Sequence, residues 1–244
     1  MMSSDNSVPL ALDMKLLEMG FNEYVNWQPE RHPMLLVVGS TGSGKTYGLK
    51  LLIAKISTHI PDSQLFLCDY KDLDFREFAN CPRRFSYEDC TEGLNIFYSS
   101  FNARLDGSDT TTHRKFLLID EYAAYIISRE KKAAEEIKSK ISVLLMMGRG
   151  VQHHIIIGLQ RGDANLFNNG ARDNFGAILA MGNISKEQKL MLFPDFREEM
   201  NHTNGRGQGY LSLDGNSDGL KRVIIPSVTN FDKLNNAIRE GLSR

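Results

Sequence analysis

The sequence predicts an α/β fold in which helices cover both faces of a mostly parallel β-sheet. Short apolar runs typical of buried strands alternate along the chain with longer segments of helical periodicity. The first such run ends in a glycine-rich turn that leads directly into a helical segment. Strands are expected at residues 34–38, 64–69, 115–120, 153–159, 176–181, 208–213 and 221–226. Helices are expected at residues 44–58, 88–105, 131–147, 185–193 and 230–242.

The chain is interpreted as one domain over residues 34–244 that follows an N-terminal extension, residues 1–33. Within the extension, residues 10–19 have helical spacing. Residues 106–113 are polar and are expected to form a loop. The sequence has no internal repeat, linker or low-complexity tract, and its 244 residues suit one α/β domain with small appendages.

Composition narrows the class of protein. Hydrophobic residues make up 41% and charged residues 24%, which is enough for a core of normal size. No apolar run approaches the roughly 20 residues of a membrane-spanning helix, and the N-terminus has no signal-peptide pattern, so a cytoplasmic location is expected. A net charge of −1 gives no support for broad nucleic-acid binding, although a few loop residues could still contact DNA. Cys68, Cys81 and Cys90 match no zinc spacing and are expected to be free thiols.

The strongest motif is GSTGSGKT, which matches the phosphate-binding P-loop pattern at every fixed position. Its residues are Gly39, Ser40, Thr41, Gly42, Ser43, Gly44, Lys45 and Thr46. The glycines let the backbone turn tightly and direct its N–H groups at phosphate oxygens, while the following helix adds positive charge at its N-terminus. Lys45 is expected to contact the β- and γ-phosphates of ATP, and the Thr46 hydroxyl to bind Mg²⁺.

A second motif, FLLIDEY at residues 116–122, places two carboxylates at the end of an apolar strand. Ligands bind at this end of the strands in open parallel sheets. Asp120 suits the Walker B role of holding Mg²⁺ through water, and Glu121 suits the positioning of an attacking water. Gln160 ends a later strand, where it either contacts the γ-phosphate or is an ordinary solvated residue.

Two adjacent histidines, His153 and His154, are expected to face opposite sides of one strand. A metal pair is therefore disfavoured, and both are interpreted as core or surface side chains. Asp163 and Asp173 are interpreted as turn or helix caps.

With these segments in place, the chain resembles the FtsK/SpoIIIE branch of the FtsK–HerA DNA-translocating ATPases over about residues 30–230. The resemblance lies in HPMLLVVGSTGSGKTYGLK, FLCDYKDLDF, LLIDEYAAYI, GRGVQHHIIIGLQR and GRGQGYLSL, which follow the family's order and spacing. The segment RDNFGAILAMGNISKEQKLMLF is similar to the FtsK-type ATPases of Gram-positive conjugative elements. The resemblance implies a RecA-like P-loop NTPase motor that binds ATP and Mg²⁺ and forms a homohexameric ring with nucleotide between subunits.

The resemblance also implies roles for residues outside the two motifs. Arg149 would be the arginine finger that completes a neighbouring subunit's site, and Gln160 would sense the γ-phosphate. The residues that match DNA-contacting positions are Arg161, Arg172, Lys186 and, less strictly, Lys189. Such contacts go to backbone phosphates, so the expected partner is DNA, double-stranded and bound without sequence preference.

The chain departs from the family in two ways. Gly162 stands where the family's Gln-Arg is usually followed by proline, and the sequence has no room for the membrane anchor or winged helix of the cell-division members. We therefore expect a bare motor that a partner protein loads, such as a relaxase, a channel or a capsid component. Three functions remain open: a DNA translocase of a mobile element, a viral genome-packaging ATPase, or a secretion or assembly ATPase that does not act on DNA.

Overall fold

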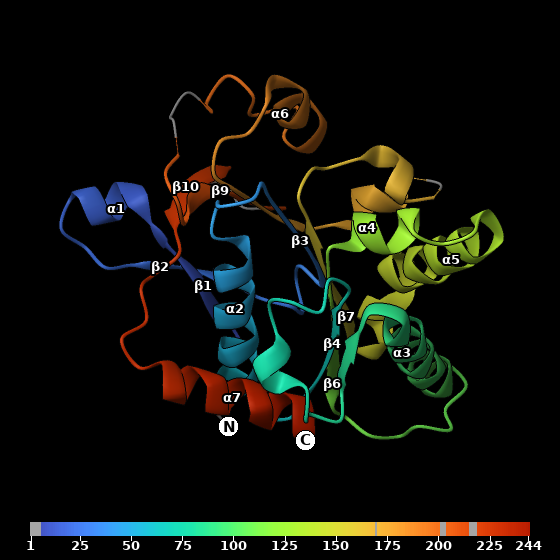
Figure 1. Ribbon diagram of the computed structural model, residues 1–244. Helices are drawn as coiled ribbons and strands as arrows, with labels where there is room; N and C mark the ends of the chain where they lie inside the picture. Colours follow the sequence, from blue (N-terminus) through green and yellow to red (C-terminus); the bar gives the residue numbers. More distant parts are fainter. Residues whose placement is uncertain (1–5, 169, 201–203, 215–218) are drawn as a thin grey trace.

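The computed structural model describes residues 6–168, 170–200, 204–214 and 219–244 (Figure 1). Within these ranges, ten strands form one sheet in the order β2-β1-β10-β9-β8-β3-β7-β6-β4-β5. The strands are β1 (Val8–Asp13), β2 (Tyr24–Trp27), β3 (Met34–Gly39), β4 (Ser63–Asp69), β5 (Arg84–Ser86), β6 (Arg114–Asp120), β7 (His153–Leu159), β8 (Ala177–Met181), β9 (Gln208–Leu213) and β10 (Leu220–Ile224). The helices are α1 (Met14–Glu18), α2 (Lys45–His59), α3 (Cys90–Leu105), α4 (Tyr122–Ile127), α5 (Lys131–Met147), α6 (Lys186–Leu192) and α7 (Phe231–Ser243).

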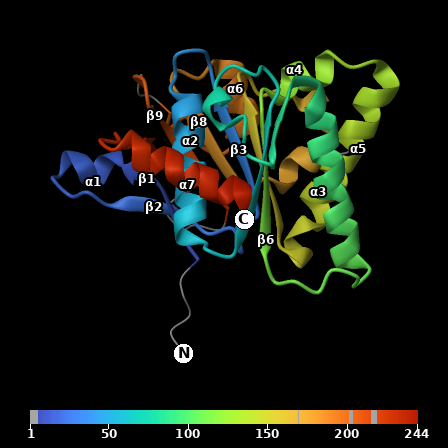
Figure 2. The same ribbon diagram turned by 60° about the horizontal axis from the view of Figure 1, so that its bottom comes forward.

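One half of the sheet is parallel and deeply buried. β8, β3, β7, β6, β4 and β5 pair in parallel in that order. Helices α2 and α7 pack on one face, and α3, α4 and α5 pack on the other (Figure 2). Every residue of β3 and β7 is buried, because strands covered on both faces are apolar along their whole length. The predicted α/β class is confirmed, and the parallel order brings the carboxyl ends of these strands to one edge.

The other half of the sheet is antiparallel, so the expected alternation of strand and helix fails for the late strands. β9 pairs antiparallel with both β8 and β10. Only residues 214–219 connect β9 to β10, whereas a parallel crossover needs about a dozen residues or more. This short connection allows only antiparallel pairing, and it was already visible in the sequence.

The first 33 residues contribute strands to the same sheet, since β1 pairs with β10 and β2 pairs with β1. The predicted helix over residues 10–19 is wrong in its first half, which is strand β1. Helix α1 begins only at Met14, where Asp13 Oδ1 accepts hydrogen bonds from the backbone N–H of Lys15 (3.0 Å) and Leu16 (3.3 Å). Pairing with two neighbouring strands overrides the local helical spacing. The division of the chain at residue 34 stays a prediction.

The two adjacent histidines are core residues on opposite faces of β7. The His153 ring packs edge-on against Phe97 and bonds to Ser100 Oγ (3.0 Å). The His154 ring stacks on Phe116 with a centroid distance of 4.6 Å. Burial lowers the pKa of His153 to about 4 and that of His154 to about 3, so both are neutral at pH 7.

These histidines predict an acid-sensitive fold. The unfolded chain binds protons on them below about pH 6.5, while the folded chain does so only near pH 4 and below. The free energy of unfolding should therefore fall as pH drops from 6.5 to 4, by on the order of 3 kcal/mol per histidine. Urea unfolding at several pH values measures this slope, which His154→Leu should flatten. An unchanged slope in that variant would contradict the assignment.

Cys68, Cys81 and Cys90 are buried free thiols. Over the part of the chain that the structure describes, no helix combines the length and apolarity needed to cross a bilayer.

Candidate nucleotide-binding and hydrolysis site

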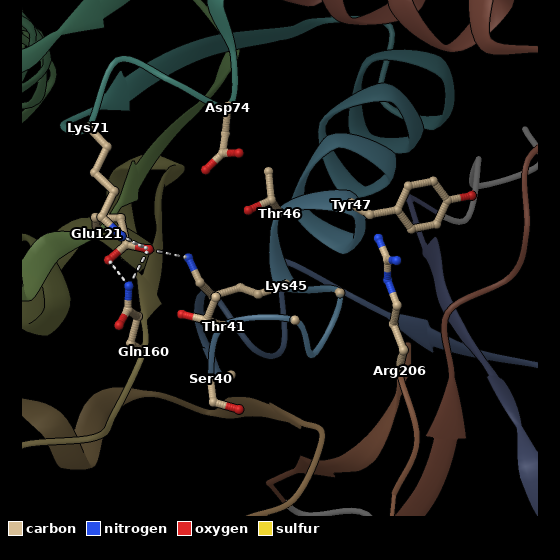
Figure 3. A pocket seen from close by; sticks show the side chains of 13 residues that line it. Ser40, Thr41, Lys45, Thr46, Tyr47, Lys71, Asp74, Glu121, Gln160 and Arg206 are labelled. Atoms are coloured by element: carbon tan, nitrogen blue, oxygen red, sulfur yellow. Dashed lines mark hydrogen bonds and ion pairs between the residues drawn. The ribbon is translucent and has the colours of Figure 1, made fainter.

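The P-loop connects the central strand β3 to helix α2. The backbone is left-handed at Gly42 (φ 82°) and at Gly44 (φ 95°), conformations that glycine adopts without strain. A Cβ on Gly39 would lie 2.5 Å from Ser43 Oγ, so a larger residue there would collide with the loop. The loop opens onto a cleft of about 280 Å³ at the carboxyl edge of the parallel strands (Figure 3). A helix N-terminus behind such a loop is a ready anion site.

Strand β6 delivers both carboxylates next to the P-loop lysine. Lys45 Nζ forms an ion pair with Asp120 Oδ1 and lies 3.3 Å from Glu121 Oε1. All three side chains are buried. The structure thus brings together the three predicted residues that carry charge at the site.

Glu121 has a strained backbone. Its φ of 56° and ψ of 40° are left-handed, a conformation that costs a non-glycine residue about 1–3 kcal/mol. The strand ends at Asp120 and α4 begins at Tyr122, so Glu121 forms the whole turn between them. The turn directs the Glu121 side chain into the cleft (Figure 3). A strand that continued straight past Asp120 would not direct it there.

The two carboxylates have pKa values shifted in opposite directions. Burial raises the pKa of Asp120 and outweighs the attraction of Lys45. Burial acts the same way on Glu121, but Lys45, Lys71 and Gln160 together outweigh it and lower the pKa of this carboxyl group. Glu121 is therefore held ionised at neutral pH.

Gln160 and Lys71 hold the Glu121 carboxylate from the side opposite the P-loop. Gln160 is the first residue after β7. Its Nε2 donates hydrogen bonds to Glu121 Oε2 (3.1 Å) and Oε1 (3.3 Å). Lys71 Nζ lies 3.1 Å from Glu121 Oε1. Sequence reasoning missed Lys71, although it lies just beyond Asp69, which pairs with Asp120 across β4 and β6. The signal was a basic residue two positions after the end of a parallel strand.

The donor set fits a magnesium ion. Asp120 Oδ2 is buried and has no hydrogen-bond partner among the described residues. The other carboxylate oxygen, Oδ1, accepts hydrogen bonds from Lys45 Nζ and from the backbone N–H of Glu121. The Thr46 side chain lines the nucleotide cleft, and Asp120 lies behind that lining, paired with Lys45. Oxygen ligands of this kind suit Mg²⁺, which keeps several waters and is shared with substrate phosphates. Thr46 and Asp120 would hold the ion, which would supply positive charge to the phosphate oxygens.

The chain matches a known protein family over more than half of its length. The model of the FtsK/SpoIIIE family matches residues 4–161. The chain belongs to the FtsK/SpoIIIE family. The match includes β1 and β2 and ends just after Gln160.

This FtsK/SpoIIIE-family chain is similar to a curated bacterial protein along most of its length. It is 24% identical over 234 residues to the Ftsk domain-containing protein YdcQ of Bacillus subtilis (strain 168), covering 88% of this chain and 48% of that relative. The chain thus spans about half the length of the curated relative.

Solved structures share the fold at low sequence identity. The pCW3 conjugation coupling protein TcpA with ATPγS has a TM-score of 0.70 at 15% identity, over 88% of this chain and 67% of that one. EccC (ATPases 2 and 3) of Thermomonospora curvata, in complex with a signal sequence peptide, has a TM-score of 0.69 at 19% identity, over 93% and 42%. The packaging NTPase B204 of Sulfolobus turreted icosahedral virus 2 has a TM-score of 0.52 at 15% identity, over 79% and 96%.

Arg149 lies far from the cleft of its own chain. It is exposed in the short helix η3 (Gly148–Val151), which precedes β7 at the amino edge of the sheet. The P-loop follows β3 at the carboxyl edge, and β3 and β7 run parallel. The seven residues of β7 span roughly 20 Å, so this arginine cannot reach its own cleft.

The residues assigned to DNA contacts differ in their surroundings. Arg161 and Lys186 are exposed and form no ion pair with the described residues. Lys189 Nζ instead donates to the backbone oxygen of Met200, so its ammonium group has a structural partner. The side chain of Arg172 lies outside the described residues.

Gly162 and Asp163 follow Arg161 in the chain and lie outside the hydrolysis site. A Cβ on Gly162 would meet the terminal methyl group of Met191 in α6, the flexible end of a side chain that can move aside, so this contact alone does not require glycine in place of the family's proline. Asp163 Oδ1 accepts from the backbone N–H of Asn165 (2.9 Å), so its predicted capping role is confirmed.

Proposed function

We propose that this chain is an ATP-driven DNA translocase of a mobile genetic element that works as a homohexameric ring. One observation carries the proposal: Gln160, which bonds to Glu121, is followed directly by Arg161, an exposed cation. A change at the hydrolysis site is therefore one residue away from a side chain that can hold a DNA phosphate. Lys186, exposed at the start of α6, is the second candidate contact beyond the same edge of the sheet.

The reaction follows from the groups in the cleft. The triphosphate of ATP competes with Asp120 and Glu121 for Lys45, because charge-assisted hydrogen bonds to phosphate are strong. Glu121 is then released from Lys45 and orients a water molecule for attack on the γ-phosphorus. Lys71 and Gln160 still favour the ionised carboxylate after this release, so that Glu121 can accept the water proton. Gln160 moves with Glu121 and carries Arg161 with it.

The oligomeric part of the proposal depends on Arg149. Because this arginine lies at the amino edge of the sheet, it can complete a hydrolysis site only on another copy of the chain. A ring in which each amino edge faces the next carboxyl edge provides that geometry. A docking protein, such as a relaxase or channel component, would supply the directional loading.

The ATPase rate with and without DNA tests this function. Double-stranded DNA is expected to raise the turnover rate several-fold, with weaker stimulation at high salt because phosphate contacts release counterions. Arg161→Ala and Lys186→Ala should lower the ratio of the rates with and without DNA. Lys132→Ala, which removes an exposed cation of α5, is the matched control and should leave the ratio unchanged. A rate indifferent to every form of DNA would count against the motor.

A protein-directed ATPase is the second candidate. EccC, whose structure was solved with a signal sequence peptide, aligns over 93% of this chain. The net charge of −1 also gives no bulk attraction for DNA. Stimulation by an unfolded peptide but not by DNA would favour this alternative. A viral packaging role, as for B204, shares DNA stimulation with the main proposal and differs from it in the docking partner.

A further inference from the structure

The nucleotide cleft has a second end that the hydrolysis chemistry does not use. Figure 3 shows Glu121, Lys71 and Gln160 at one end, and Tyr47 and Arg206 at the other. Lys45 and Thr46 lie between the two groups. A nucleotide whose γ-phosphate faces Glu121 must extend its nucleoside away from that carboxylate. The opposite end of the cleft is where the nucleoside would lie.

The segment that carries Arg206 is fixed to the P-loop. The backbone N–H of Gly207 donates to the Ser43 carbonyl (2.7 Å), and the N–H of Ile225 donates to the Gly207 carbonyl (2.8 Å). The P-loop and the segment around Gly207 approach so closely that a Cβ on Gly44 would lie 3.2 Å from the Gly207 backbone nitrogen. Arg206 is exposed, but its backbone is therefore held at the mouth of the cleft.

Tyr47 provides a fixed wall beside it. Its hydroxyl donates to the Pro226 carbonyl (3.1 Å) and accepts from the backbone N–H of Val228 (2.8 Å). Both bonds anchor the far end of the ring, so the side chain cannot swing across the cleft. The first residue after the GKT of the P-loop is thus a rigid aromatic surface.

Three cationic side chains line the cleft, and among the described residues Arg206 alone of the three forms no ion pair with a carboxylate. Lys45 pairs with Asp120, and Lys71 pairs with Glu121. Arg206 forms no ion pair or hydrogen bond with the residues that the structure describes. A guanidinium group lies flat on aromatic rings, and it is more weakly hydrated than an ammonium group. Its free state suits a ligand rather than a structural role.

We propose that Arg206 binds the nucleobase of ATP and ADP, with its guanidinium plane lying on the face of the base beside the Tyr47 wall. The contact fixes where the base lies and adds affinity that the phosphates do not supply. The inference rests on the nucleotide-binding part of the proposed function and is independent of DNA translocation.

Calorimetric titration of ADP and of pyrophosphate, both with Mg²⁺, tests the proposal in the full chain without DNA. Pyrophosphate retains the phosphates of ADP and lacks the nucleoside. Arg206→Ala should weaken ADP binding by about 10-fold, as expected for a partly desolvated cation–π contact, and should change pyrophosphate binding less than twofold. Arg206→Lys should be nearly as weak as Arg206→Ala, since it keeps the charge and loses the planar group. Arg239→Ala, an exposed arginine of α7, is the matched control.

Three outcomes would overturn the proposal. ADP affinity could be unchanged in Arg206→Ala, in which case the side chain does not contact the nucleotide. ADP and pyrophosphate could weaken in parallel and recover in Arg206→Lys, which would assign Arg206 to a phosphate. The wild-type chain could fail to bind ADP at all, which would remove the proposed function as well. Thermal melting checks that each variant is folded.

Discussion

Replacement of Glu121 by glutamine is expected to lower the ATP turnover rate by about 10²–10⁴-fold while ATP binding is retained. Glutamine has nearly the same shape and can still bond to Gln160, but it cannot take up the proton of the attacking water. It also removes a negative charge from Lys45 and Lys71, which leaves the cleft more attractive to a triphosphate. Single-turnover hydrolysis and a separate equilibrium titration of ATP distinguish the two effects.

The contrast with Lys45→Ala sharpens this expectation. Loss of the lysine should abolish tight nucleotide binding, whereas Glu121→Gln should trap bound ATP. Lys50→Ala is the control on the same helix, because Lys50 pairs with Glu77 (2.6 Å) away from the cleft, and partly exposed pairs of this kind contribute little. A Glu121→Gln protein that turns over ATP within threefold of the wild-type rate would show that another group activates the water.

Removal of the Arg149 guanidinium is expected to lower the turnover rate of the assembled ring by about 10³–10⁵-fold. The reason is geometric: Arg149 lies across the length of β7 from its own cleft and can stabilise transition-state charge only in a second copy. Hydrolysis rates of Arg149→Ala at concentrations where the wild-type ring forms measure the effect.

Mixed rings test whether the arginine acts between subunits. Arg149→Ala subunits keep an intact P-loop, and Lys45→Ala subunits keep an intact arginine. Mixing them should restore part of the activity, since some interfaces combine both intact groups. Absence of any recovery in rings that are well mixed by mass measurement would assign Arg149 to another role. Lys132→Ala again serves as the exposed-cation control.

The sequence predicted the parallel half of the sheet and the proximity of Lys45, Asp120 and Glu121. Continuous apolar runs such as residues 34–38 can be buried on both sides only in such a sheet, and the P-loop spacing is dictated by the phosphates it binds. Asp120 and Glu121 could be selected from the sequence because they end an apolar strand, and the carboxyl ends of parallel strands lie at the edge of the sheet where ligands bind.

The remainder of the site depends on contacts between distant segments. Lys71 reaches Glu121 only because β4 and β6 pair in register, and Arg206 reaches the cleft only through the bond between Gly207 and Ser43. The strand over Val8–Asp13 likewise forms by pairing with strands from both ends of the chain. Local periodicity carries no information about such pairings, so it gave a helix in place of part of this strand.

Release of a third-strand oligonucleotide from the end of a DNA duplex most directly tests the claim that this chain converts ATP hydrolysis into movement along DNA. With ATP, the assembled wild-type chain should displace the oligonucleotide, and Glu121→Gln should bind the same duplex and leave the oligonucleotide in place. If the wild-type chain hydrolyses ATP and the oligonucleotide stays bound, then hydrolysis by this protein drives something other than DNA translocation.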